Sequence, residues 1–192
     1  MKKLLLVMGD LATGKSTFAG MLSQRYQVVA LYKDTFKETL GDTIGFSNRE
    51  ENLRLSVASA ALMRMTFTEF CKLDKDLILE SNFRQAELEK LHAIAKEYDY
   101  DVLTVTLRAD VNILHKRFLH RLYHENRHAV HACGGFEEFE NFQEYVLGQR
   151  NLIIPGTFME LSANTFEYQQ NVQVLNELDQ FMGCHFSDDV VK

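Results

Sequence analysis

The 192-residue sequence predicts a three-layer α/β/α fold in which helices cover both faces of a five-stranded, mainly parallel sheet. Short apolar runs alternate with amphipathic windows along the chain, which is typical of strands alternating with helices. A glycine-rich segment joins the first apolar run to the first helical window. Neither the single proline, Pro155, nor any low-complexity stretch marks a boundary, so residues 1–192 are expected to form one domain.

Five short apolar runs are expected to form the strands. They lie at about 3–8, 27–32, 76–81, 101–107 and 157–162. The first run is apolar at successive positions, which suits a parallel strand covered on both faces. In the last run, the residues Phe158 to Leu161 fit a helix as well, so that alternative stays open.

Helical windows separate these runs. Ser47 and Glu50 form a capping box ahead of a long helix at about 48–73. This helix is apolar around most of its circumference and is therefore expected to be largely enclosed. The windows at about 85–98 and 111–124 each place apolar side chains on one stripe, and a terminal helix follows the last strand.

The residues from Gly9 to Ser16 match G-x-x-x-x-G-K-[S/T], the pattern of a phosphate-binding loop, between a predicted strand and a predicted helix. The two glycines let successive N–H groups surround a phosphate at the positive end of the helix dipole. Lys15 is expected to bind the β- and γ-phosphates, and the Ser16 hydroxyl suits Mg²⁺. A glycine-rich turn with an ordinary surface lysine is the alternative. The expected nucleotide-binding residues are Gly9, Asp10, Leu11, Ala12, Thr13, Gly14, Lys15, Ser16 and Thr17.

Asp34 follows the second predicted strand closely. In a doubly wound sheet, ligands bind beyond the carboxyl ends of the strands, so Asp34 is expected in the same cleft as the phosphate-binding loop. A carboxylate there can accept the proton of an attacking hydroxyl group. Alternatively Asp34 caps a helix that starts at Thr35, and the two roles are compatible.

Glu80 ends an apolar run with the position and character of a Walker B strand. It is a candidate for holding Mg²⁺ through a water molecule or for contacting substrate. Asn82 and Arg84 follow directly and are candidates for contacts with the acceptor. The alternative is that these residues only cap the next helix.

Basic residues gather between Arg108 and Arg127, where Arg117, Arg121 and His124 share one helical face. Guanidinium groups on a closing segment would neutralise the charge of a transferring phosphoryl group and exclude water. We expect this lid at about 117–136, with Gly134 and Gly135 as a hinge or loop. A solvated basic helix is the alternative. Nothing in the sequence completes a metal site around the histidines at 120, 124 and 128.

The order and spacing of these residues resemble the small P-loop kinases, in particular the group typified by chloramphenicol phosphotransferase and the 5′-polynucleotide kinase domain. The resemblance implies a P-loop NTPase fold of the nucleoside monophosphate kinase type, with ATP and Mg²⁺ as cofactors. It implies that Asp34 is the general base. It also implies that Lys37, where the family usually has arginine, contacts the acceptor.

The same resemblance assigns the lid arginines to Arg121 and Arg127, with Arg117 as the other choice. It places the segment from Ser162 to Thr165 at the adenine pocket. The chain departs from the family at Glu80, where aspartate is more usual, and this leaves the metal shell open.

Composition limits the function further. The net charge of −6 provides no electrostatic footprint for wrapping duplex nucleic acid. No run approaches the ~18 apolar residues of a membrane span. Three separated cysteines, at 71, 133 and 184, indicate a reducing cytosol.

The sequence therefore predicts a cytoplasmic, ATP-dependent kinase that phosphorylates a hydroxyl group of a small molecule. Three alternatives remain: a nucleic-acid 5′-end kinase, an ATPase or nucleotide switch without an acceptor, and a kinase-type toxin aimed at a sugar nucleotide. The oligomeric state, including a homodimer, stays open.

Overall fold

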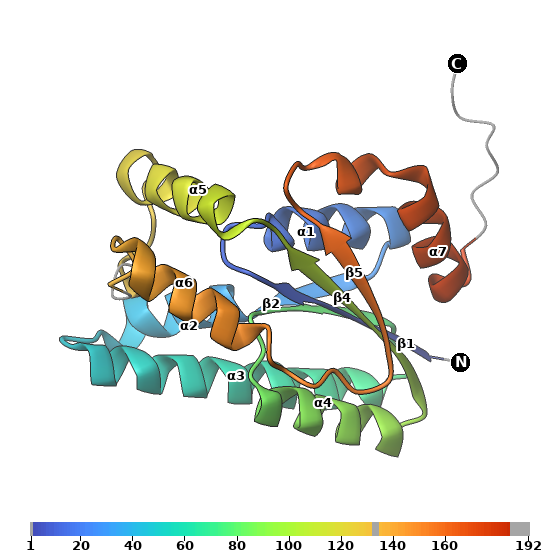
Figure 1. Ribbon diagram of the computed structural model, residues 1–192. Coiled ribbons are helices and arrows are strands. Elements are labelled where there is room, and N and C mark those ends of the chain that lie inside the picture. Colours follow the sequence, from blue (N-terminus) through green and yellow to red (C-terminus); the bar gives the residue numbers. More distant parts are fainter. Residues whose placement is uncertain (1, 132–134, 185–192) are drawn as a thin grey trace.

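The computed structural model describes residues 2–131 and 135–184, which form one parallel sheet with helices on both faces (Figure 1). The strands are β1 (Lys2–Gly9), β2 (Val29–Tyr32), β3 (Leu77–Glu80), β4 (Tyr100–Arg108) and β5 (Thr157–Ser162). Their order is β2-β3-β1-β4-β5, and every neighbouring pair is parallel. The predicted five-stranded α/β fold is confirmed, and the segment after Gly156 forms a strand and not a helix.

Seven α-helices and two short 3₁₀ helices occur in the described ranges. The α-helices are α1 (Lys15–Tyr26), α2 (Lys33–Ile44), α3 (Arg49–Cys71), α4 (Gln85–Glu97), α5 (Val111–His124), α6 (Phe139–Gln149) and α7 (Val172–Met182). The 3₁₀ helices are η1 (Ala129–His131) and η2 (Glu167–Gln170). The helix α6 was not among the expected elements, and α2, which the alternative for Asp34 starts at Thr35, begins at Lys33.

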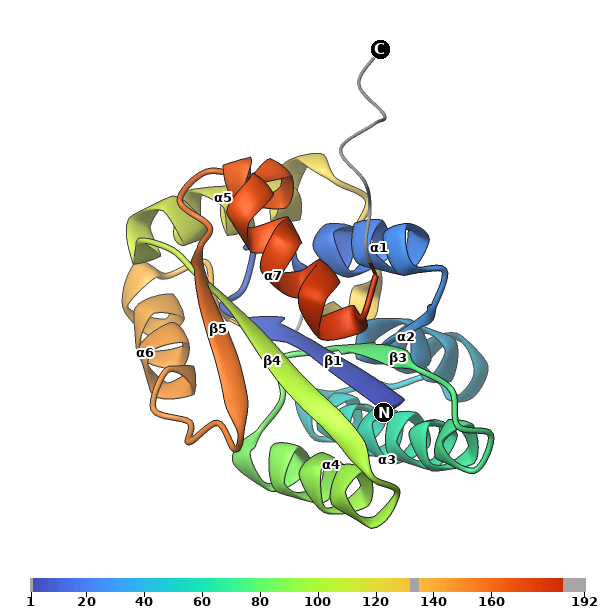
Figure 2. The ribbon, with the colours of Figure 1, turned by 90° about the vertical axis from the view of Figure 1, so that its right-hand side faces the viewer.

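The sheet separates two hydrophobic cores, as the view along the layers shows (Figure 2). Successive side chains of a strand point to opposite faces. Thus Leu5 and Val7 of β1 pack with α1, α5, α6 and α7, whereas Leu4 and Leu6 pack with α3 and α4. An uninterrupted apolar run is therefore what this central strand requires.

The start of α3 differs from the prediction by one residue. Asn48, and not Ser47, is the N-cap, and its side chain accepts a hydrogen bond from the backbone N–H of Glu51. The Glu51 carboxylate in turn accepts from the backbone N–H of Ser47 at 2.6 Å. The expected pairing of Ser47 with Glu50 is wrong, because the chain turns into the helix one position later.

The expectation that α3 is largely enclosed is also wrong. One face is buried, through Leu55, Ser59, Met63, Phe67 and Cys71. On the opposite face Leu53, Val57 and Met65 are 45%, 63% and 58% exposed. The helix lies on the outer side of its layer, so only the stripe toward the sheet is covered.

All five strands end at the same edge of the sheet, where α2, α5 and α6 gather beyond the arrowheads in Figure 1. Among residues 2–131 and 135–184, none of the helices has the length and hydrophobicity of a membrane span. Cys133 and Gly134, which belong to the expected lid, lie outside the described residues.

Candidate active site

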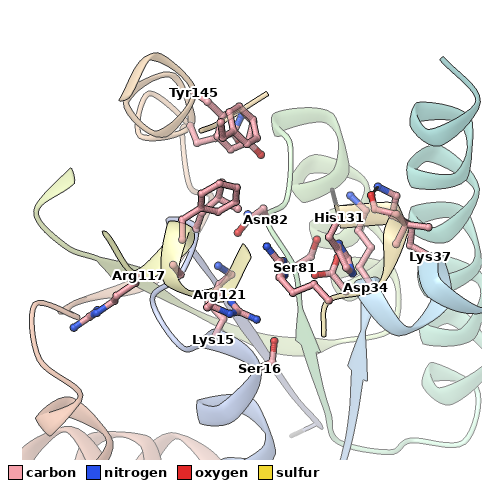
Figure 3. Close-up of a pocket in the computed structure, with 18 of the residues that line it drawn as sticks. Lys15, Ser16, Asp34, Lys37, Ser81, Asn82, Arg117, Arg121, His131 and Tyr145 are labelled. Carbon is pink, nitrogen blue, oxygen red and sulfur yellow. Dashed lines mark hydrogen bonds between the residues drawn. The ribbon is translucent and has the colours of Figure 1, made fainter. Parts of the chain in front are cut away.

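A cleft of about 1710 Å³ opens at the carboxyl ends of the strands (Figure 3). The loop after β1, the starts of α2 and α3, the end of β3, and α5 and α6 form its walls. The sequence-predicted residues that line it are Leu11, Ala12, Gly14, Lys15, Ser16, Thr17, Asp34, Lys37, Glu80, Asn82, Arg84, Arg117, Arg121 and Arg127. Most of the residues expected to act together are thus brought into one cavity.

The two glycines of the loop are required by its backbone. Gly9 has a φ of 130°, and a Cβ there would lie 2.1 Å from the carbonyl oxygen of Leu107. Gly14 has a φ of 85° and caps the amino terminus of α1. Larger residues are strained in this left-handed region, so both positions favour glycine.

Lys15 is buried, and its ammonium donates a hydrogen bond to the carbonyl oxygen of Asp10 at 2.6 Å. Burial lowers the pKa of Lys15, and the nearby carboxylates of Glu80 and Asp34 oppose this shift. The hydrogen bond to Asp10 thus holds the Lys15 ammonium against the backbone of the phosphate-binding loop.

The Asp10 side chain points away from the cleft. Its carboxylate, only 3% exposed, accepts hydrogen bonds from the Arg150 guanidinium and from the backbone N–H of Ala109. Arg150 also donates to the carbonyl oxygen of Ala109. This clamp ties the loop to the end of β4 and to the residue after α6. Arg150 was missed because 140 residues separate it from Asp10.

We expect Arg150→Ala to destabilise the fold by roughly 3 kcal/mol, because it leaves the buried Asp10 charge without its partner. Arg54→Ala is the matched control. It removes an ion pair with Glu50 in which both side chains are more than 70% exposed, and should cost less than about 1 kcal/mol. Urea unfolding measures both values. Equal losses in the two variants would show that the clamp does not stabilise the loop.

Ser16 and Glu80 lie side by side at the carboxyl edge of the sheet. The Ser16 hydroxyl donates to Glu80 Oε2 at 3.1 Å, although the two residues are 64 positions apart. β1 and β3 are neighbours in the sheet, which brings their carboxyl ends together. Burial raises the pKa of Glu80, and the positive charge of Lys15 opposes this shift. A hydroxyl and a carboxylate oxygen at this spacing fit Mg²⁺, which prefers oxygen ligands.

Asp34 lies within the first turn of α2, which begins at Lys33 after the N-cap residue Tyr32. The alternative that Asp34 caps a helix from Thr35 is therefore wrong. Its side chain is exposed to the cleft and makes no hydrogen bond with the described part of the chain. The carboxylate is thus accessible to a ligand.

Lys37 lies one turn further along α2 and supports the wall of the cleft. Its ammonium donates to Asn52 Oδ1 at 2.7 Å and to the carbonyl oxygen of Val130 at 3.1 Å. Asn52 also donates to Val130. These bonds join α2, α3 and η1. An acceptor that contacts the Lys37 ammonium would therefore bind a group that already donates to Asn52 and Val130.

Two of the three candidate lid arginines face Lys15 and Asp34. The positive charge of Arg121 lowers the pKa of Lys15, and the negative charge of Asp34 raises the pKa of Arg127. Burial lowers the pKa of Arg127, and the charge of Arg121 lowers it further. Arg121 also pairs with Glu125 at 3.1 Å. The positive charges at 15, 121 and 127 are thus close enough to affect one another.

Arg117 points away from this group (Figure 3). It donates to the carbonyl oxygens of Ala163 and Asn164 at 2.7 and 2.8 Å, and its guanidinium lies 4.3 Å from the centre of the Phe166 ring. A Cβ on Gly14 would lie 3.0 Å from the same ring. The segment after β5 therefore lies against the phosphate-binding loop, where the adenine pocket is expected.

The three histidines considered for a metal do not gather. The rings of His120 and His124 are 4.9 Å apart, whereas His128 hydrogen-bonds Asp42 on α2 at 2.9 Å.

One wall of the cleft was missed entirely, because α6 was not predicted. Asn141, Glu144 and Tyr145 project from α6 into the cleft, and Phe142 and Val146 of the same helix are buried. Burial raises the pKa of Tyr145. Apolar residues four positions apart were the available signal for this helix.

Comparisons with known proteins fit this geometry. The sequence pattern of a family described as an AAA domain matches residues 4–134. No curated protein matches the chain. A candidate kinase of Chloroflexus aurantiacus j-10-fl has a similar structure, with a TM-score of 0.80 and 25% identity, over 97% of this chain and 99% of that chain.

Two further structures share the fold at lower identity. A gluconokinase of Sinorhizobium meliloti 1021 has a TM-score of 0.60 at 13% identity, covering 94% of this chain and 91% of that one. A shikimate kinase of Bacteroides thetaiotaomicron has a TM-score of 0.57 at 12% identity, covering 94% and 98%. The predicted P-loop NTPase fold and the resemblance to small P-loop kinases are confirmed. The narrower resemblance to chloramphenicol phosphotransferase stays a prediction.

Proposed function

The chain belongs to the AAA domain family, and on that premise we propose that it is an ATP-dependent phosphotransferase that phosphorylates a hydroxyl group of a small molecule. One observation carries the proposal. The phosphate-binding loop, the Ser16–Glu80 pair, the accessible Asp34 carboxylate and two arginines face the same cleft. Phosphoryl transfer requires this set, because its catalysis is mostly positioning and electrostatic stabilisation.

The nucleotide half of the cleft would hold the triphosphate. Amides of the loop and the Lys15 ammonium bind its oxygens, and Arg117 with Phe166 borders the base. Ser16 and Glu80 would hold Mg²⁺, which would neutralise part of the phosphate charge.

The transfer step needs a base and cations. Asp34 takes the proton of the acceptor hydroxyl, and the oxygen of that hydroxyl bonds to the γ-phosphorus of ATP. The bond from the γ-phosphorus to the β–γ bridging oxygen breaks, which releases ADP. Arg121 and Arg127 stabilise the charge on the transferring group. Asn82 lines the cleft and is available to orient the hydroxyl.

Residues 1–192 would act as one kinase domain, with a lid at about 117–136. The free thiols of Cys71 and Cys184 are in keeping with a location in the cytosol.

Labelled ATP, incubated with the purified protein and a library of hydroxylated metabolites, tests the function. A labelled metabolite is expected. ATP hydrolysis that no metabolite affects, with no labelled product, would favour an acceptor-free ATPase or switch. Labelling of oligonucleotide ends would favour a nucleic-acid kinase, and growth arrest on expression would favour a toxin.

A further inference from the structure

The cleft has the opposite charge balance to the whole chain. Nine lysine and arginine side chains and four carboxylate side chains line it, whereas the sequence has 21 basic and 27 acidic residues. Basic residues are thus concentrated in the cleft, and their combined field attracts anions.

Four of these basic residues belong to the nucleotide half of the cleft. Lys15, Arg121 and Arg127 belong to the proposed phosphate site, and Arg117 lies beside Phe166. On the acceptor side, two lysines already have partners within the protein. Lys33 pairs with Glu87 at 3.3 Å, and Lys37 donates to Asn52 and Val130. Lys116 is next to Arg117 on α5, and the remaining two basic residues are Arg49 and Arg84.

Arg49 and Arg84 differ from most other arginines of the chain. Arg25, Arg54, Arg108, Arg121 and Arg150 each form an ion pair with a carboxylate. Arg49 and Arg84 are exposed, line the cleft, and have no carboxylate within ion-pair distance in the ranges that the structure describes. Both guanidinium groups are therefore available to a ligand.

These two arginines line the same cleft as Asp34. Asn52 lies three residues after Arg49 on α3, and it bonds Lys37, which lies three residues after Asp34 on α2. Arg84 lines the same cleft, and the charges of both Arg84 and Asp34 affect the pKa of the Tyr145 hydroxyl, in opposite directions. A molecule whose hydroxyl reaches Asp34 thus lies in the same cleft as both guanidinium groups.

We infer that the acceptor carries an anionic group, a carboxylate or a phosphate monoester, in addition to its hydroxyl, and that Arg49 and Arg84 bind this group. The inference rests on the proposed function for the role of the hydroxyl. Guanidinium groups suit the assignment because each can donate two parallel hydrogen bonds to carboxylate or phosphate oxygens. Arg49 and Arg84 would then determine the specificity for the acceptor.

The test separates the two halves of the cleft. The protein is first saturated with Mg²⁺ and the non-hydrolysable ATP analogue AMP-PNP, with binding followed by calorimetry. Inorganic phosphate and, separately, acetate are then titrated at low ionic strength, while the side-chain Nε–H signals of arginine are recorded by NMR. We expect a second anion to bind the loaded protein and to shift the signals of Arg49 and Arg84.

Variants identify the site. Arg49→Gln and Arg84→Gln should each weaken the binding of the second anion about tenfold, as expected for the loss of a charged hydrogen-bonding partner. Arg54→Gln, on α3 but outside the cleft, should leave it unchanged. Tighter binding of phosphate would identify a phosphate monoester, and tighter binding of acetate a carboxylate.

If neither anion binds the loaded protein at high millimolar concentration, the inference is wrong. It is also wrong if the double variant Arg49→Gln, Arg84→Gln binds them like the wild type. Failure of AMP-PNP itself to bind would count against the proposed function instead, so the two failures can be told apart.

Discussion

Replacement of Lys15 by alanine is expected to abolish phosphoryl transfer. The rate should fall by about 10³-fold or more, the size expected when a cation that stabilises the transferring charge is lost. The fold should survive, because the ammonium is buried at the cost of its hydration and, within the described residues, it donates a hydrogen bond only to a backbone carbonyl of the same loop. Transfer of labelled phosphate to a verified acceptor measures the effect.

The control for this variant is Lys90→Ala. Lys90 is exposed on α4 and does not line the cleft, so its removal should leave transfer unchanged. Thermal unfolding of both variants separates lost catalysis from lost structure. A Lys15→Ala protein that is folded and transfers phosphate at the wild-type rate would remove the loop from the mechanism.

Replacement of Asp34 by asparagine should lower turnover by about 10²-fold or more, the usual contribution of a general base. Asparagine keeps the shape of the side chain but cannot take the proton of the acceptor hydroxyl. Because Asp34 makes no hydrogen bond with the described residues, the variant should fold normally. The affinity for Mg·ATP should change little, since the nucleotide phosphates are held by the loop.

Asp42→Asn on the same helix is the matched control. Asp42 bonds His128 at the outer side of α2 and is 75% exposed, so turnover should stay at the wild-type value. Steady-state kinetics with one acceptor, at saturating Mg·ATP, compares the two variants. Equal turnover in Asp34→Asn and wild type would show that another group takes the proton.

The phosphate-binding loop could be predicted from the sequence because its chemistry is local. Gly9, Gly14, Lys15 and Ser16 lie within eight consecutive residues, and the flanking strand and helix have their own patterns. Asp34 and Glu80 could be placed because the ends of parallel strands meet at one edge of the sheet. Their convergence on Lys15 follows from topology, without knowledge of any side-chain contact.

Contacts between distant parts of the chain could not be predicted. Arg150 reaches Asp10 across 140 residues, and Arg117 bonds the segment after β5 across 46 and 47 residues. Both arginines are ordinary in their local sequence, so only the fold reveals their partners. The choice among the three lid arginines depended on these contacts.

The surroundings of α3 were misjudged for a related reason. Its apolar composition indicated enclosure, but composition does not report how many layers the fold places around a helix. Leu53, Val57 and Met65 remain exposed because no further element covers that side in the described ranges. The expected caps were also displaced, by one residue at Ser47 and by two at Asp34, where Tyr32 is the N-cap.

The central claim is that backbone amides at the bend between β1 and α1 encircle the phosphates of a nucleotide. Titration of isotopically labelled protein with Mg·ATP, followed by NMR at the amides of residues 9–17, tests it most directly. The account predicts saturable binding, with the largest shifts at these amides and little change in the Lys15→Ala variant. An absence of binding heat together with unchanged amide signals throughout this segment would contradict it.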